Sequence, residues 1–82
     1  MKRLLAFETR AGTFYIGQSP DGRFHPISND ESLGSYAQIW QATEDLAHDA
    51  TFSVLHPETG EPLDTSQLSI PDNPNEWVRL GS

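Results

Sequence analysis

Residues 13–46 combine two hydrophobic periodicities, and this combination constrains the fold more than any other feature of the chain. Apolar side chains alternate from Thr13 to Gln18, which is the pattern of a β-strand with two distinct faces. After Tyr36 they recur at helical spacing, and turn-forming residues occupy positions 19–22 and 29–32. The stretch therefore predicts strand, turn, strand, turn, strand and helix, in that order.

The turn at residues 19–22, with the sequence Ser-Pro-Asp-Gly, fixes the register of the strands on either side. Proline at its second position and glycine at its fourth are typical of a tight turn. Extending the strands from this turn pairs Ile16 with Pro26 and Tyr15 with Ile27. Because Pro26 has no amide hydrogen, we expect it at an edge or a bulge rather than in a regular central ladder.

This register also sorts the side chains between the two faces of the sheet. One face carries Phe14, Ile16, Phe24 and Pro26, and the other carries Tyr15, His25 and Ile27. Since both faces carry apolar residues, we expect each to be covered at least in part. Gly17 lies opposite His25 and is expected to mark a close approach to its backbone.

Further elements are predicted on both sides of this hairpin. Strands are expected at residues 3–8 and 33–36, and a helix at residues 38–48. At 100° per residue, one stripe of that helix should pack on the sheet, and it gathers Ile39, Ala42, Thr43 and Leu46. Trp40 lies at the shoulder of this stripe.

The C-terminal part of the chain carries weaker signals. Residues 51–55 are a candidate strand, and Asp64 is expected to cap one helical turn that runs through Leu68. Four prolines between residues 57 and 74 predict irregular structure. Residues 77–80 are expected to dock as a final anchor or edge strand.

Together these elements predict an α+β fold. It comprises an antiparallel sheet of three to five strands, one helix packed on a face, and a loop-rich C-terminal segment. The 82 residues are expected to form a single small domain, residues 1–82. Its core should lie at about residues 3–55, and an irregular proline-rich segment at about residues 56–82. The chain has no cysteine, so packing alone must hold it together.

The net charge of −7 arises from twelve carboxylates spread along the chain against five basic residues. Nucleic-acid binding needs a clustered basic face, so we expect no direct contact with nucleic acid. The apolar run after Lys2 and Arg3 stops at Glu8, too early for a secretory signal. No apolar run approaches the length of a membrane span. We therefore expect a cytoplasmic protein without a membrane partner.

The titratable residues form no recognisable catalytic or metal motif. Glu44 and His48 lie one helical turn apart and would make a zinc-binding set with His56, but the spacing matches no metal motif. The competing interpretation is three surface histidines with a weak Glu44–His48 pair. No G-x-S-x-G elbow and no phosphate-binding loop is present. We predict no enzyme activity, no catalytic residue, no metal site and no cofactor.

Three aromatic residues are the candidate contacts for a partner: Trp40, Tyr15 and Tyr36. Aromatic side chains anchor many interfaces, and in a small domain they also complete the core. Trp40 lies off the helical stripe, which favours its exposure. The leading hypothesis is a non-catalytic protein–protein interaction module that binds a protein partner or a second copy of itself. The alternatives are an acidic mimic that inhibits a nucleic-acid-binding protein and a domain that binds a small molecule or a metal.

Residues 14–46 carry a pattern with an aromatic-rich strand, an Asp-Gly hairpin, the segment ESLGSY at 31–36 and the helical sequence ATEDL at 42–46. This pattern resembles small uncharacterised bacterial domains of unknown function that join a three-stranded antiparallel meander to one helix. The residues at 37–39 depart from the Ser/Thr-Pro that typically starts the helix there. Those families have no assigned activity, so the resemblance implies a fold and a bacterial source.

Overall fold

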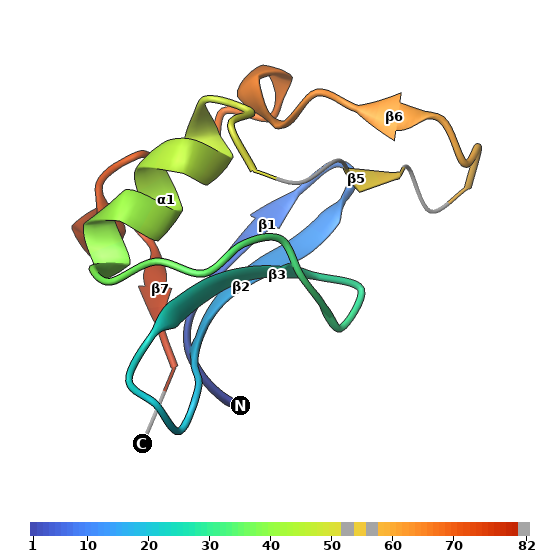
Figure 1. Ribbon diagram of the computed structural model, residues 1–82. Coiled ribbons are helices and arrows are strands. Elements are labelled where there is room, and N and C mark those ends of the chain that lie inside the picture. Colours follow the sequence, from blue (N-terminus) through green and yellow to red (C-terminus); the bar gives the residue numbers. More distant parts are fainter. Residues whose placement is uncertain (52–53, 56–57, 81–82) are drawn as a thin grey trace.

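The computed structural model describes residues 1–51, 54–55 and 58–80 of the chain (Figure 1). A five-stranded sheet has the order β4-β3-β2-β1-β7, and every neighbouring pair is antiparallel. Its strands are β1 (Lys2–Thr9), β2 (Gly12–Gln18), β3 (Phe24–Ser28), β4 (Glu31–Ser32) and β7 (Val78–Arg79). Helix α1 (Ile39–Ala47) lies on one face of this sheet. The predicted α+β class is confirmed.

The register of β2 and β3 is the one that the turn predicts. Ile16 pairs with Pro26, and Tyr15 pairs with Ile27. Pro26 is one strand in from the sheet edge, but on its outer side lie residues 33–35, which belong to no strand. Its carbonyl accepts a hydrogen bond from the N–H of Leu33 at 2.7 Å. Proline is therefore tolerated where the neighbouring ladder is interrupted.

The return strand of the second hairpin begins earlier than predicted, and the prediction of a strand over residues 33–36 is wrong. Asn29 and Asp30 both have positive φ, 51° and 64°, which is the geometry of a two-residue hairpin turn. Such a turn starts the return strand at once, so β4 is Glu31–Ser32. Of the predicted strand only Tyr36 pairs again, through a bridge to Phe24.

Helix α1 agrees with its predicted limits to within one residue at each end. The side-chain oxygen of Gln41 accepts a hydrogen bond from the backbone N–H of Gln38 at 3.2 Å, which helps to start the helix. The predicted apolar stripe is the buried face, with Ala42 and Leu46 fully buried and Ile39 half-buried. No helix in the described ranges is long and apolar enough to cross a membrane.

The C-terminal part contains more regular structure than the sequence indicates. β5 (Val54–Leu55), inside the candidate strand at 51–55, pairs with β6 (Pro62–Leu63), which the sequence analysis missed. Residues 52–53 lie outside the described ranges. Two short 3-10 helices follow, η1 (Thr65–Gln67) and η2 (Pro74–Glu76). Asp64 caps η1 as predicted, and β7 is the predicted edge strand beside β1.

The core lies between the sheet and helix α1, and it extends beyond the expected limit of residue 55. The C-terminal part contributes Leu68, Ile70 and Trp77 to the cluster that contains Phe14 and Leu46. Apolar burial of this kind is the main stabilising term for a cysteine-free domain. Residues 63–77 thus contribute side chains to the hydrophobic core and do more than wrap around it.

Two buried threonines fasten this segment to the helix. The hydroxyl of Thr43 on α1 donates to the carbonyl of Asp72 at 2.8 Å. The hydroxyl of Thr65 donates to the carbonyl of Leu46 at 2.5 Å. Both side chains are fully buried, so each hydrogen bond is made away from water, where an unpaired group would be costly.

The other face of the sheet carries no described helix or strand (Figure 1). Its cover comes from side chains. The guanidinium of Arg3 lies 4.3 Å from the centroid of the Tyr15 ring. Gly17 leaves room for two apolar side chains, because a Cβ there would be 2.7 Å from Cδ1 of Ile27 and 2.8 Å from Sδ of Met1. We call this surface the open face.

Candidate binding groove

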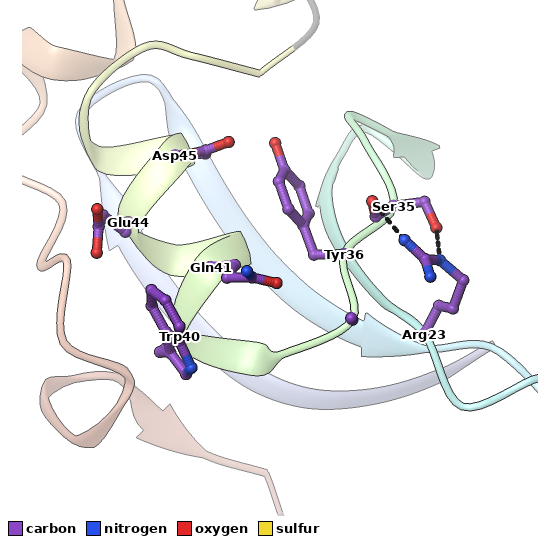
Figure 2. A pocket seen from close by; sticks show the side chains of 8 residues that line it. Arg23, Ser35, Tyr36, Trp40, Gln41, Glu44 and Asp45 are labelled. Atoms are coloured by element: carbon purple, nitrogen blue, oxygen red, sulfur yellow. Dashed lines mark hydrogen bonds between the residues drawn. The ribbon is translucent and has the colours of Figure 1, made fainter.

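An open groove of about 380 Å³ lies between helix α1 and the segment that leads into it (Figure 2). The wall formed by the helix consists of Trp40, Gln41, Glu44 and Asp45, and the other wall consists of Arg23 and residues 35–37. Trp40 and Glu44 are four residues apart and so are neighbours on the helix surface. The same spacing relates Gln41 to Asp45. The helical wall therefore presents two adjacent rows, each ending in a carboxylate.

The position of Tyr36 between these walls depends on a glycine. A Cβ at residue 34 would be 2.8 Å from Cε2 of the Tyr36 ring, so only Gly34 lets the ring lie against the backbone there. The backbone of Tyr36 is fixed as well, because it exchanges two hydrogen bonds with Phe24, each 2.8 Å long. The ring is consequently held in place without help from a ligand.

The phenol of Tyr36 is electrostatically coupled to the helical wall. Burial of the hydroxyl is the largest cause that raises the pKa of Tyr36 to about 12. The nearby carboxylate of Asp45, through its negative charge and its acceptor oxygens, raises the pKa further. The Tyr36 and Asp45 side chains point toward one another in Figure 2.

This coupling predicts a specific pH dependence. The folded pKa of Tyr36 lies above the ordinary value of 10.0, so Tyr36 contributes stability that is present below pH 10 and is lost as the pH rises toward 12. Asp45→Asn removes the negative charge and should lower the pKa of Tyr36 in a titration that follows phenolate absorbance. The variant Tyr36→Phe has no phenol at this position, so the transition that disappears from its titration curve belongs to Tyr36. An identical Tyr36 titration in the wild type and Asp45→Asn would show that Asp45 does not act on the phenol.

Arg23 is held on the wall opposite the helix by a single residue. Its Nε donates to Oγ of Ser35 at 2.5 Å, and its Nη2 donates to the carbonyl oxygen of Ser35 at 3.1 Å (dashed lines in Figure 2). Within the described ranges it makes no ion pair with a carboxylate. The groove thus has an unneutralised cation on one wall and carboxylates on the other.

The three candidate contact residues lie on two different surfaces. Trp40, with 51% of its surface exposed, and the half-buried Tyr36 both line the groove. Tyr15 lies on the open face beneath the guanidinium of Arg3, which also pairs with Asp30. Because the sheet separates the two surfaces, Tyr15 does not belong to the same site as the other two.

Sequence reasoning did not propose Arg23, Ser35 or Gln41 for this site. Arg23 and Ser35 meet because the chain after β4 returns alongside β3, where their neighbours Phe24 and Tyr36 pair. The Arg23–Ser35 contact could have been predicted from the register of residues 33–36 against β3. The sequence pattern gives no such register. The capping contact of Gln41 with the backbone N–H of Gln38 gives no periodic signal in the sequence.

The described residues contain no group of three or more histidine, cysteine, aspartate or glutamate side chains placed to hold a metal ion. Nε2 of His48 lies 3.7 Å from Oδ2 of Asp72, and the ring nitrogens of His25 each lie 3.0 Å from a serine hydroxyl. His56 lies outside the described residues. The proposed set of Glu44, His48 and His56 therefore stays a hypothesis.

No protein-family model matches this sequence, and the comparisons with curated proteins and with solved structures likewise give no match. The resemblance to bacterial domains with a meander and one helix therefore stays a prediction. What the groove can do chemically has to be argued from its own residues. It offers an exposed indole, two carboxylates, and a guanidinium that forms no ion pair with a carboxylate of the described residues.

Proposed function

We propose that this domain is a non-catalytic protein–protein interaction module whose partner binds in the groove beside Trp40. The observation that carries this proposal is the 51% exposure of Trp40 at the edge of a groove of about 380 Å³. Tryptophan is among the residue types most enriched at the energetic centres of interfaces, where it fills a hollow on the partner or is enclosed by it.

The side chains of the groove are positioned by contacts within the domain itself. Gln41 accepts a hydrogen bond at the start of the helix, the Tyr36 ring packs against Gly34, and Arg23 donates to Ser35. A site whose side chains are already ordered loses less conformational entropy when a partner binds. Charges of opposite sign on facing walls favour partners with the complementary pattern and disfavour others.

A second candidate is self-association through the open face, and exposed apolar residues favour it. Val78 has 64% of its surface exposed and Leu80 has 37%. Both line a hollow of about 440 Å³ together with Phe7 and Tyr15. Packing of this face against a second copy would cover these side chains, whereas the groove proposal leaves them in water.

A comparison of two exposed-residue variants tests both candidates. The tagged wild type, Trp40→Ala and Val78→Ala serve as baits in lysate of the source organism, and light scattering measures their oligomeric state. We expect wild type and Val78→Ala to retain one dominant protein equally, and Trp40→Ala to retain about tenfold less, because hot-spot aromatic residues carry much of the binding energy. All three baits should have similar melting temperatures, since both side chains are exposed.

The other outcomes are equally informative. Undiminished retention by Trp40→Ala would place the interface elsewhere than the groove. If the wild type forms a dimer that Val78→Ala disrupts and Trp40→Ala preserves, the open face is the interface. Retention that is abolished by moderate salt for every bait would favour the acidic-mimic alternative, because screened charges would then dominate.

A further inference from the structure

We propose that the groove accepts an arginine side chain of the partner, with its guanidinium stacked on the indole of Trp40 and paired with the carboxylate of Glu44. This inference rests on the proposed function and specifies the chemistry of the partner. It is supported by the lack of a charged partner for these two groups among the described residues, by the arrangement of similar groups elsewhere in the fold, and by the charge of the opposite wall.

Trp40 and Glu44 form an adjacent pair on the surface of helix α1. They are neighbours on the exposed side of α1 because they are four residues apart. Glu44 makes no ion pair with any residue in the described ranges, whereas the side chain of Asp45 points toward that of Tyr36 (Figure 2). No cation within those ranges lies over the Trp40 ring. The indole face and one carboxylate are therefore both free to receive a cation.

The open face shows how this chain holds a guanidinium. Arg3 lies with its guanidinium carbon 4.3 Å from the centroid of the Tyr15 ring and forms an ion pair with Asp30. An aromatic ring and a carboxylate thus enclose an arginine from two sides. The groove presents the same two kinds of group, with the larger indole in place of the phenol, and the arginine has to come from another molecule.

Arginine suits this pair better than lysine. Its planar guanidinium stacks on an aromatic face, and the N–H groups in the guanidinium plane donate to a carboxylate. The ammonium group of lysine is more strongly hydrated and has no flat face to stack. The net charge of −7 attracts basic segments over long range, and Arg23 on the opposite wall repels a second cation. The groove is therefore suited to one guanidinium.

The test uses the full chain and two peptides of identical length. One is a Gly/Ser peptide that carries spaced arginines, and the other carries citrulline at the same positions, which keeps the planar shape and removes the charge. Binding is followed by the NMR signals of the two indole N–H groups. The Trp77 indole N–H donates to the carbonyl of Pro71 at 2.9 Å and serves as an internal control.

We expect the arginine peptide to shift the Trp40 indole signal in a saturable manner and to leave the Trp77 signal unchanged. The citrulline peptide and the variant Glu44→Gln should each weaken binding by about fivefold or more, as expected for loss of a cation–π contact or an ion pair. Glu8→Gln is the matched control, because Glu8 is an exposed carboxylate beside the open face. It should bind the arginine peptide like the wild type.

Equal binding of the two peptides, or equal effects of Glu44→Gln and Glu8→Gln, would overturn the inference. The absence of any selective shift at Trp40 would overturn it too. The proposed function fails separately, through undiminished partner retention by Trp40→Ala. A partner that is lost with Trp40→Ala but retained with Glu44→Gln would leave the interaction module in place and remove its preference for arginine.

Discussion

Trp77→Ala is expected to lower the free energy of unfolding by about 3–5 kcal/mol, the usual cost of truncating a buried tryptophan. Trp77 is only 4% exposed, and its ring centroid lies 5.8 Å from that of Phe7. Truncation would leave a cavity under the edge strand and would remove the hydrogen bond from the indole N–H to the carbonyl of Pro71. A domain of this size has a total stability of about 5–15 kcal/mol, so the variant should unfold at much lower urea concentration.

Trp40→Ala is the matched control, because it removes the same side chain from an exposed position. We expect its free energy of unfolding to stay within about 1 kcal/mol of the wild-type value. Urea unfolding of both variants under the same conditions makes the comparison. Similar losses would mean that Trp40 contributes to the core and that its exposure in the groove is not the basis of binding.

The second large effect is expected at Thr65. Thr65→Val keeps the shape of the side chain and removes the hydroxyl that donates to the carbonyl of Leu46 at the end of helix α1. Among the described residues, that carbonyl would then keep the longer 3.3 Å hydrogen bond from the N–H of Asp49. The loss should be about 1–3 kcal/mol in urea unfolding, because a buried acceptor loses its better partner.

Ser66→Ala controls for this prediction. Ser66 is the exposed neighbour of Thr65, and within the described part of the chain its hydroxyl donates to the capping carboxylate of Asp64 alone. Its replacement should change the stability by less than about 1 kcal/mol. If Thr65→Val is no more destabilising than Ser66→Ala, the bond to Leu46 does not fasten the C-terminal part to the helix.

The first hairpin and the helix were predictable because their determinants are local. The turn at residues 19–22 sets the register of β2 and β3 by itself, and the stripe from Ile39 to Leu46 specifies which side of the helix is buried. The register of the hairpin and the buried side of the helix each depend on a few neighbouring residues. Tertiary packing favours the same conformations as these local residues do.

The second hairpin was predicted with the wrong strand limits because its turn uses residues that permit several conformations. Asn29 and Asp30 tolerate positive φ, but nothing in their sequence requires both to adopt it at once. Because the turn at Asn29 and Asp30 is only two residues long, β4 ends at Ser32. Leu33 therefore lies beyond the strand, where its side chain is buried in the core. Leu33 is apolar because it belongs to the buried core cluster, and not because it lies in a strand.

The groove was predictable only in part, since most of it depends on contacts between distant segments. The position of Trp40 on the shoulder of the helix indicates its exposure, and the structure confirms that it is exposed. Two other features depend on the path of residues 33–37, and this path has no hydrophobic periodicity. They are the contact of Arg23 with Ser35 and the packing of the Tyr36 ring against Gly34. Leu68 and Ile70 likewise lie in a segment that the hydrogen bonds of Thr43 and Thr65 join to helix α1.

The pairing of β7 with β1 joins residues from nearly opposite ends of the sequence, Leu5 with Arg79. Contacts of this separation form late, since closing the long intervening loop costs entropy that only the finished core offsets. Until β7 docks, the outer edge of β1 is unpaired backbone, to which β7 of another molecule can add as well. We therefore expect refolding at high protein concentration to yield intertwined, domain-swapped dimers and refolding at high dilution to yield none.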